Sequence, residues 1–524
     1  MRYFQRMSEC RQLTLKMGRQ RLWVTCTTVF QTLFIIHFRK GASTMVDCLG
    51  SRFAVDDKRL HEVLDKARDF ALSTGISMKS LQGEKGSMLA ECAPFTLFPS
   101  VVPRACFQQA VDCMLDFNRL IHKVAHDHNF LEKSLKNVLQ VDDFTQGLWK
   151  IYTKVRGEGY TQPLSLGLFR NDFMLDVKDP DHVQPKQVEF NTISSSFAGL
   201  TTSTVLLHRF ILDMMGKQYD TEEVPDNDPA LGLAQGMVKA WELYGRKQAV
   251  LLFIVSEAER NIFDQRALEF KAYSLNHGVR VLRRTYLDIY NNASLTEDKR
   301  LMVDGDEVAV VYLRTGYEPD AFPTHKEWDA RLKMERSLAI KCPSIQYQLA
   351  GTKKIQQELT LPGSVEQFIK DPVAVKRIRA TFVKLHSLDL GPDGDKGVEI
   401  GKTDPDKYVL KPQREGGGNN LYGKDISKFL EAHQKSEERN AYILMERIFP
   451  KSQKNYLLKP GIPFVLSDVI SELGIYGVYI GSATEESMNT QCGHMLRTKV
   501  LGTDEGGICA GFAGLDTPFL VSTD

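Results

Sequence analysis

The sequence predicts a mixed α/β protein, and two observations carry this prediction. Residues 247–255 (KQAVLLFIV) form a continuous apolar run, which is typical of a buried parallel strand. An amphipathic stretch follows, and then two further strand-like segments at 279–286 and 307–317. Strand, helix and strand at this spacing indicate a βαβ unit. With 42% hydrophobic and 25% charged residues, the 524-residue chain can bury a sizeable core.

The first 44 residues differ from the rest of the chain. They contain eight basic residues and one acidic residue, Glu9. Residues 22–38 are largely apolar, but the run is shorter than the roughly 20 residues that span a bilayer, and it contains threonine, glutamine and histidine. We expect an extension without a fold of its own, upstream of a start at Met45. An organelle-targeting segment is the first alternative, and a membrane anchor is the last.

Charge and cysteine usage narrow the classes of function. The formal net charge of +1 gives no global field that would attract nucleic acid. The nine cysteines show no CxxC pair and no repeated spacing, so they predict neither a disulfide framework nor a zinc site. We therefore expect a reducing compartment, the cytoplasm, without a nucleic-acid partner or stable membrane association.

After the extension, residues 45–245 are predicted to form the N-terminal part of the core. Two strands are expected there: PLSLGLFRNDFMLD (163–176), which is buried and runs into a loop, and the start of KQVEFNTISSSFAGL (186–200), which continues into a polar turn. Apolar residues spaced three and four apart predict helices between these strands and around them. The helical stretches are 45–90, 105–160 and 201–245.

Two further parts complete the predicted organisation. Residues 246–345 contain the parallel strands and are predicted to be a small α/β domain, with polar residues at the strand ends where ligands of such sheets bind. Residues 346–524 alternate strands with two glycine-rich loops. Strands are expected at the start of 408–423 and 495–514 and across 442–448 and 469–480.

One motif is a decoy. GVEIGKT (397–403) resembles a phosphate-binding P-loop, but it has three residues between its glycines where that motif needs four. It also lacks a preceding apolar strand and a following helix. The spacing matters because it aims successive backbone N–H groups at a phosphate. We therefore exclude a P-loop here.

The stretch KPQREGGGNN (411–420) has the parts of an ATP clamp. Glycines let backbone N–H groups approach a phosphate without a Cβ in the way, and Lys411 can neutralise phosphate charge. The Glu415 carboxylate and an asparagine amide oxygen suit Mg²⁺, a hard cation that often bridges phosphates. A plain surface turn is the alternative for such a glycine run taken by itself.

Other polar residues support a nucleotide–metal site. Glu189 and Asn191 alternate with apolar residues in VEFN, so both side chains point to one face of a strand. Glu472 lies inside an apolar strand, where a carboxylate needs a partner. A structural ion pair is the alternative for each acid. Three lysines could face the phosphates, and three arginines that follow apolar runs could hold carboxylates. These are Lys353, Lys411 and Lys499, and Arg170, Arg314 and Arg497.

Taken together, ten segments in order resemble the eukaryotic glutathione synthetases over residues 45–524. The resemblance implies an ATP-grasp fold with the small parallel α/β domain inserted as a substrate-binding domain, and with a glycine-rich lid. It also implies a homodimer. The segments are APFTLFPS, GLFRNDFM, VEFNTISSSFAGL, ERNIFDQR, RTGY, KCPSIQYQLAGTKK, LKPQREGGGNNLYG, YILMERI, SELGIYG and LRTK followed by DEGG.

The implied reaction is ATP-dependent ligation of γ-glutamylcysteine and glycine, with one or two Mg²⁺ ions per subunit. ATP would phosphorylate the cysteinyl carboxylate, and the glycine amine would attack the resulting acyl phosphate. A bare carboxylate is a poor electrophile because its leaving group would be oxide. Phosphorylation supplies a better leaving group, so positioning and charge neutralisation can carry most of the catalysis.

The resemblance assigns the nucleotide and metal residues by position. Glu189, Asn191 and Glu415 match the metal ligands. Met445 and Ile448 belong to a strand flanking the adenine, and Glu472 matches a contact to the ribose. The full nucleotide-binding set is Glu189, Lys353, Lys411, Glu415, Gly416, Gly417, Gly418, Asn419, Asn420, Tyr422, Met445, Glu446, Arg447, Ile448, Glu472, Lys499 and Glu505.

The substrate residues are assigned in the same way. Arg170 would stabilise charge at the acyl phosphate, and Arg497 would hold the glycine carboxylate, so these two are the expected catalytic residues. The remaining matches line the γ-glutamylcysteine and glycine sites. They are Ser194, Ser195, Ser196, Phe197, Glu259, Arg260, Asn261, Gln265, Arg314, Thr315, Gly316, Tyr317, Ile508 and Cys509.

Residues 413–422 and 501–513 are expected to be two lid loops that keep water from the acyl phosphate. GGICAG (506–511) departs from the GGVAAG common in the family, and Cys509 is larger than alanine. A ligase that uses another terminal amino acid, such as β-alanine or serine, is therefore one alternative function. The other is an inactive relative that acts as a scaffold. Every matched position holds a competent residue, which argues against this second alternative.

Overall fold

The computed structural model describes residues 57–80, 89–178, 183–416, 418–504 and 506–522, and residues 55–524 group into one compact unit. The predictions made for residues 1–44, Gly417 and Glu505 lie outside the described residues. Among the residues that are described, no helix combines the length and apolar character needed to cross a bilayer.

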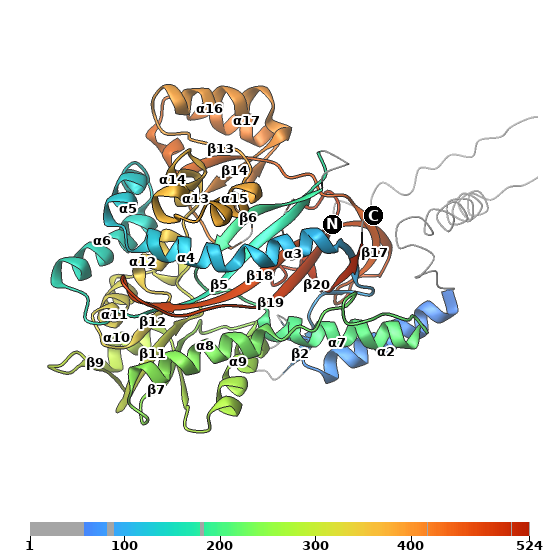
Figure 1. Cartoon of the computed structure of the whole chain (residues 1–524), viewed down its shortest axis with the longest axis horizontal. Coiled ribbons are helices and arrows are strands. Elements are labelled where there is room, and N and C mark those ends of the chain that lie inside the picture. Colours follow the sequence, from blue (N-terminus) through green and yellow to red (C-terminus); the bar gives the residue numbers. More distant parts are fainter. Residues whose placement is uncertain (1–56, 81–88, 179–182, 417, 505, 523–524) are drawn as a thin grey trace, which may run out of the picture. The chain divides into compact units, whose positions relative to one another are not determined.

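A 13-stranded sheet runs through this unit (Figure 1). At its centre, β18 (Leu466–Gly481) pairs antiparallel with β5 (Ser165–Asp176) and with β19 (Glu486–Val500). On its other side β5 pairs antiparallel with β6 (Gln184–Asn191). Beyond β19 the sheet continues through β20 (Ala513–Asp516), β3 (Phe95–Thr96) and β17 (Gln453–Leu458).

The parallel strands expected within residues 246–345 are confirmed. β7 (Val250–Ile254) is buried along its whole length and pairs in parallel with β8 (Val281–Arg284) and β11 (Asp306–Leu313). β12 (Ile340–Cys342) pairs in parallel with both β11 and β5, so these strands continue into the central sheet. The boundaries of a separate substrate-binding domain therefore stay a prediction. The edge is completed by β10 (Leu301–Val303) and β9 (Ala293–Leu295).

Helices cover both faces of the central strands. Gly477 of β18 lies against Met114 and Asn118 of α4 (Met114–Ala125), whereas its neighbour Val478 packs against Gly236 of α8 (Pro229–Tyr244). Because neighbouring strand residues point to opposite faces, α4 and α8 lie on opposite sides of the sheet, as Figure 1 shows.

Of the remaining helices, with the short helical turns left out, those up to residue 214 largely fall in the predicted helical stretches, and the one over 262–275 falls in the amphipathic stretch that follows 247–255. The helices beyond residue 285 were not predicted. The full group is α2 (Asp57–Ser73), α3 (Arg104–Asp112), α5 (His128–Leu135), α6 (Asp143–Glu158), α7 (Ala198–Met214), α9 (Ile262–Leu275), α10 (Tyr286–Asn292), α11 (His325–Glu335), α12 (Ile345–Ala350), α13 (Lys353–Thr360), α14 (Ser364–Phe368) and α15 (Pro372–Thr381).

A second, four-stranded sheet has its own small core. Its antiparallel order is β13 (Leu385–His386), β16 (Tyr442–Glu446), β14 (Tyr408–Pro412) and β15 (Leu421–Tyr422). α16 (Pro392–Thr403) and α17 (Lys424–Ala432) pack together above it in Figure 1. The sequence GVEIGKT lies inside α16, which confirms that it is not a P-loop. The buried core residues are Leu388, Val398, Leu410, Ile426, Leu430 and Leu444.

The prediction of a helix over 45–90 is wrong for residues 74–80 and 89–90, while residues 45–56 and 81–88 lie outside the described part of the chain. Gly75 adopts a positive φ of +80°, a conformation that ends the helix. The chain then forms β1 (Ser77–Lys79), which pairs antiparallel with β2 (Ala90–Cys92). Ile76 and Met78 are fully buried, so tertiary packing overrides the helical spacing here.

One further pair of strands lies outside both larger sheets: β21 (Pro518–Val521) pairs in parallel with β4 (Ser100–Pro103).

Candidate active site

Most of the predicted site residues line one pocket with a volume of about 630 Å³. The pocket lies where β5, β6, β18 and β19 face the small sheet, and both glycine-rich loops border it. The predicted residues that line it are Arg170, Glu189, Asn191, Ser194, Ser196, Phe197, Glu259, Arg260, Asn261, Arg314, Tyr317, Lys411, Glu415, Gly416, Asn420, Tyr422, Met445, Glu446, Arg447, Ile448, Glu472, Arg497, Lys499, Ile508 and Cys509.

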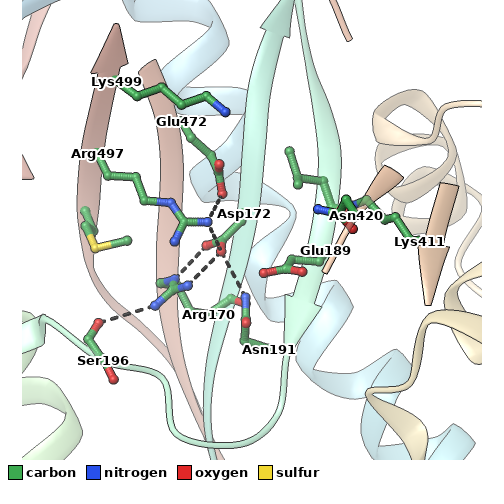
Figure 2. Close-up of polar contacts among 12 residues, drawn as sticks. Arg170, Asp172, Glu189, Asn191, Ser196, Lys411, Asn420, Glu472, Arg497 and Lys499 are labelled. Carbon is green, nitrogen blue, oxygen red and sulfur yellow. Dashed lines mark hydrogen bonds and ion pairs between the residues drawn. The ribbon is translucent and has the colours of Figure 1, made fainter. Parts of the chain in front are cut away.

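Two arginines and two carboxylates form the centre of the site (Figure 2). Arg170 donates from Nε to Asp172 Oδ1 over 2.7 Å and from Nη2 to Asp172 Oδ2 over 2.8 Å. Arg497 donates to Glu472 and lies 3.6 Å from Asp172 Oδ2. Burial alone would lower the pKa of Arg170, but the charge of Asp172 more than offsets it and raises that pKa. Both arginines therefore stay charged.

Strand geometry explains this arrangement. Arg170 and Asp172 are two residues apart on β5 and so share one face. On β18, Gly474 lies opposite Asp172. A Cβ at Gly474 would lie 2.8 Å from both Arg170 Cδ and Asp172 Oδ1, which is too close for either atom. The glycine therefore leaves the space that the ion pair occupies.

The metal-ligand prediction centres on a shared lysine. Lys353 Nζ lies 3.1 Å from Glu415 and 3.4 Å from Glu189. Burial acts to raise the pKa of both carboxyls. For Glu189 the charges of Lys353 and Lys411 outweigh it and lower the pKa to about 2, whereas the pKa of Glu415 remains raised. Lys411 Nζ donates to the carbonyl of Val188 over 3.0 Å.

These residues fit a hard cation. Asn191 Nδ2 donates to Asp172 Oδ2 over 2.9 Å and to the Arg170 carbonyl over 3.3 Å, so its amide oxygen is the atom left for a metal. Two carboxylates and one amide oxygen are typical of Mg²⁺ sites, which are completed by phosphate and water. Within the described part of the chain, no group of three or more His, Cys, Asp or Glu side chains gathers for a metal.

The opposite end of the pocket is built around Arg314. This buried side chain donates to the Ser195 carbonyl and the Tyr312 hydroxyl, each over 3.2 Å, and to Ser196 Oγ over 2.7 Å. Ser194 and Phe197 both have positive φ, of 53° and 74°. This strained turn presents the Ser195 carbonyl and the Ser196 hydroxyl to the arginine.

Backbone groups join the two glycine-rich loops. The Asp504 carbonyl accepts from Lys499 Nζ over 2.7 Å and from the Tyr422 hydroxyl over 3.2 Å. Arg447 lies 3.7 Å from the Asp504 carboxylate and stacks over the Tyr422 ring, 5.7 Å from its centroid. Arg260 donates to the carbonyl of Cys509. Both predicted lid loops therefore meet at one side of the pocket.

The chain matches the family model for the ATP-binding domain of eukaryotic glutathione synthase over residues 57–520. The chain belongs to the eukaryotic glutathione synthetase family. It is 46% identical to glutathione synthetase of Homo sapiens over 467 residues, 89% of this chain and 98% of the human protein. It is 41% identical to the chloroplastic glutathione synthetase of Arabidopsis thaliana over 433 residues, 82% of this chain and 79% of that protein.

A solved structure agrees with this membership. The chain is 26% identical to a glutathione synthetase-like effector of Globodera pallida in its apo form, with a TM-score of 0.72 over 89% of this chain and 98% of that one. The family resemblance and the mixed α/β ATP-grasp fold expected from the sequence are thereby confirmed. The roles assigned to single residues stay predictions.

Several residues with family matches do not line the pocket. Two of them contact residues that do: Lys353 lies against two lining carboxylates, and the Ser195 carbonyl accepts from Arg314. Gln265 accepts from Arg283 over 2.5 Å, and the Gly316 carbonyl accepts from Gln348 over 2.7 Å, but neither partner lines the pocket. The residues in this group are Ser195, Gln265, Thr315, Gly316, Lys353, Gly418 and Asn419.

Sequence reasoning missed two buried acids. Asp172 is fully buried between Arg170, Arg497 and Asn191. Asp264 accepts from the backbone N–H groups of Phe197 and Gly199, each over 2.8 Å, and so holds the serine turn. Side chains two residues apart on a strand share a face, so the alternation pattern could have identified Asp172 as a neighbour of Arg170. Asp264 lies in the matched segment ERNIFDQR, but no sequence pattern links it to a turn 67 residues earlier.

Proposed function

We propose that this protein is an ATP-dependent ligase that joins γ-glutamylcysteine to glycine, giving glutathione, ADP and phosphate, the second step of glutathione biosynthesis. One observation carries the proposal. A single pocket brings the lysine and carboxylate groups suited to a nucleotide together with two arginines suited to carboxylates. This is the arrangement that an acyl-phosphate ligation requires, because nucleotide, acid and amine must meet at one place.

The nucleotide would bind between the small sheet and β6. Lys353 and Lys411 are buried cations that would neutralise phosphate oxygens. Met445 and Ile448, on and just after β16, would flank the adenine ring. Mg²⁺, held by Glu189, Asn191 and Glu415, would supply charge neutralisation between the phosphates. Lys353 would then exchange its contacts with the two carboxylates for contacts with phosphate.

Arg170 and Arg497 would act on the reacting groups. Arg497 has a buried Nε without a hydrogen-bond partner among the described residues, and Gly506 lies next to it. We place the glycine carboxylate there. Arg170 would stabilise the carboxylate oxygen that attacks the γ-phosphorus, with ADP leaving. The glycine amine would then attack the acyl carbon, releasing phosphate and one proton. Arg314 and the serine turn would hold the γ-glutamyl carboxylate.

Further parts of the proposal concern the whole protein. We propose that the chain forms a homodimer and acts in the cytoplasm, with organelle targeting by residues 1–44 as the alternative compartment. Residues 413–422 and 501–513 would close over the reactants and exclude water from the acyl phosphate.

ADP release with Mg·ATP and γ-glutamylcysteine tests the function directly. Glycine, β-alanine and serine are supplied in turn, and the product mass is recorded. We expect turnover with glycine that yields glutathione. Preference for another amino acid would reassign the terminal substrate to that molecule. Folded protein that binds ATP but turns over none of them would support the scaffold alternative.

A split in kinetic constants tests the role of Arg497. Arg497→Ala should raise the KM for glycine at least tenfold more than the KM for ATP, because its guanidinium is placed at the glycine carboxylate. Equal effects on both constants would remove Arg497 from the glycine site.

A further inference from the structure

We propose that Asp172 is a positioning residue that holds Arg170 and Arg497 side by side and fixes the amide of Asn191. This inference rests on the proposed function, because it assigns to one carboxylate the joint orientation of three residues with separate predicted roles. Asp172 would itself touch no substrate. It would act through the acyl-phosphate arginine, the glycine arginine and a metal ligand at once.

The contacts of Asp172 use both of its oxygens. Oδ1 accepts from Arg170 Nε over 2.7 Å, and Oδ2 accepts from Arg170 Nη2 over 2.8 Å. Oδ2 also accepts from Asn191 Nδ2 over 2.9 Å and lies 3.6 Å from an Arg497 nitrogen. The side chain is fully buried. Figure 2 shows its contacts with both arginines and with Asn191. Such a dense set of contacts leaves the carboxylate little freedom to rotate.

Electrostatics explain why a carboxylate is needed at this position. Two guanidinium groups that approach one reacting centre repel each other, and burial strengthens that repulsion. Asp172 lies between them and contacts both. Without it, Glu472 would be the one charged partner left to Arg497 among the described residues, and Arg497 would be drawn toward β18. The glycine carboxylate would then meet a displaced guanidinium.

The amide of Asn191 depends on the same carboxylate. An asparagine side chain has a nitrogen that donates and an oxygen that accepts, and its partners decide which faces where. Asp172 accepts from the nitrogen of Asn191. The oxygen therefore remains for a cation. Replacing Asp172 by asparagine would put another amide against Asn191 and remove this selection.

Asp172→Asn is the direct test, since it keeps the shape and removes the charge. We expect kcat to fall by about 10²-fold, the size of effect that a misplacement of about 1 Å can have. The KM for glycine should rise about tenfold. The Kd for ATP, measured by binding without Mg²⁺ and without the other substrates, should change less than about threefold, because Lys353 and Lys411 do not contact Asp172.

Gly474→Ala provides a second variant that leaves every charge in place. Its methyl group would press on Arg170 Cδ and Asp172 Oδ1, each 2.8 Å away. The φ of Gly474 does not require glycine, so the fold should be kept at a cost of overpacking. We expect the same pattern in a milder form: a higher KM for glycine and an almost unchanged Kd for ATP.

Asp116→Asn is the matched control. Asp116 is also a buried carboxylate, and it accepts from Arg377 over 2.8 Å, but it lies on α4 outside the pocket. Asp116→Asn should lower the melting temperature without raising the KM for glycine relative to the Kd for ATP. Arg497→Lys, made alone and with Asp172→Asn, measures coupling. We expect the combined loss in kcat/KM to be clearly smaller than the product of the single losses.

The outcomes separate two kinds of failure. If Asp172→Asn and Gly474→Ala left the KM for glycine unchanged, or if Asp172→Asn and Arg497→Lys had independent effects, Asp172 would be a structural residue only. If the parent protein made no glutathione from γ-glutamylcysteine and glycine, the proposed function itself would fall.

Discussion

Residues 413–422 and residues 501–513 border the same pocket, but different kinds of chemical group hold the two loops in place. The first loop is fixed by side chains: Glu415 pairs with Lys353 over 3.1 Å, and Gln413 accepts from the Lys354 backbone over 3.1 Å. The second loop is fixed mainly by its carbonyls, at Asp504 and Cys509.

Substitutions should therefore affect activity differently in the two loops. A side-chain contact is lost when the residue changes, whereas a carbonyl contact survives most substitutions that keep the backbone path. Side-chain identity should therefore weigh more in the first loop. In the second loop, the size of a side chain should affect activity more than its charge or polarity. The following predictions test this contrast, beginning with the substitution that should cost the most activity.

Glu415→Gln should have the largest effect. It removes a charged metal ligand and one of the two carboxylates that share Lys353, so we expect kcat to fall roughly 10²- to 10³-fold, as when other preorganised charge contacts are removed. Steady-state kinetics at saturating substrates measure this. Glu358→Gln is the control. Glu358 lies on α13, outside the pocket, and pairs with Lys354 of the same helix over 3.2 Å. A Glu415→Gln variant as active as the control would refute the ligand assignment.

Lowering the pH should act through the same residue. Burial raises the pKa of Glu415, whereas nearby cations lower that of Glu189 to about 2. As the pH falls, Glu415 therefore takes up a proton first, and the apparent affinity for Mg²⁺ should fall with it. A Mg²⁺ titration of turnover at several pH values measures this effect. The dependence should flatten in Glu415→Gln, and an unchanged dependence would point to another group.

Gly506→Ala should have the largest effect in the second loop. A methyl group there would lie 3.7 Å from both Arg497 Nε and Glu472 Oε2, in the space assigned to the glycine carboxylate. We expect the KM for glycine to rise about tenfold, within the range that one methyl group contributes in a binding pocket. The KM for ATP should stay nearly constant. Gly502→Ala is an unsuitable control, because Gly502 has a positive φ of 87°.

Asp504→Asn should have a modest effect. The variant loses the ion pair between Asp504, whose side chain is 49% exposed, and Arg447, whose side chain is 36% exposed. It keeps the backbone carbonyl that accepts from Lys499 and Tyr422. Exposed ion pairs contribute up to about 1 kcal/mol, so we expect less than about a fivefold change in kcat/KM. A larger loss would show that the side chain, and not the carbonyl, joins the two loops.

Cys509→Ala should have the smallest effect. Cys509 is exposed as a residue, and the contact with Arg260 is made by the backbone carbonyl. We expect the KM values for glycine, β-alanine and serine to stay within about twofold of the parent. A shift toward β-alanine or serine would instead identify Cys509 as the residue that narrows the amino-acid site, and would break the contrast between the loops.

The sequence predicted parts of the site for clear physical reasons. Alternation along VEFN placed Glu189 and Asn191 on one face, and both line the pocket. Lys411, Glu415 and Gly416 of the glycine run also line the pocket, and the sequence could single them out because charge and backbone freedom are local properties. The role of this run as an ATP clamp stays a prediction. The helix over 45–90 failed in part, since burial of Ile76 and Met78 depends on packing that spacing does not encode.

By itself, the sequence determined the mixed α/β class, the main strands, the family and most residues of the pocket, because these depend on local periodicity and on matched motifs. Only the tertiary structure decided how the buried charges pair. Asp172 is adjacent in space to Arg497, although 325 positions separate them, because β18 lies between β5 and β19 and carries Gly474 opposite Asp172. Contacts of this kind arise from strand pairing, which brings distant segments into register and leaves no local trace.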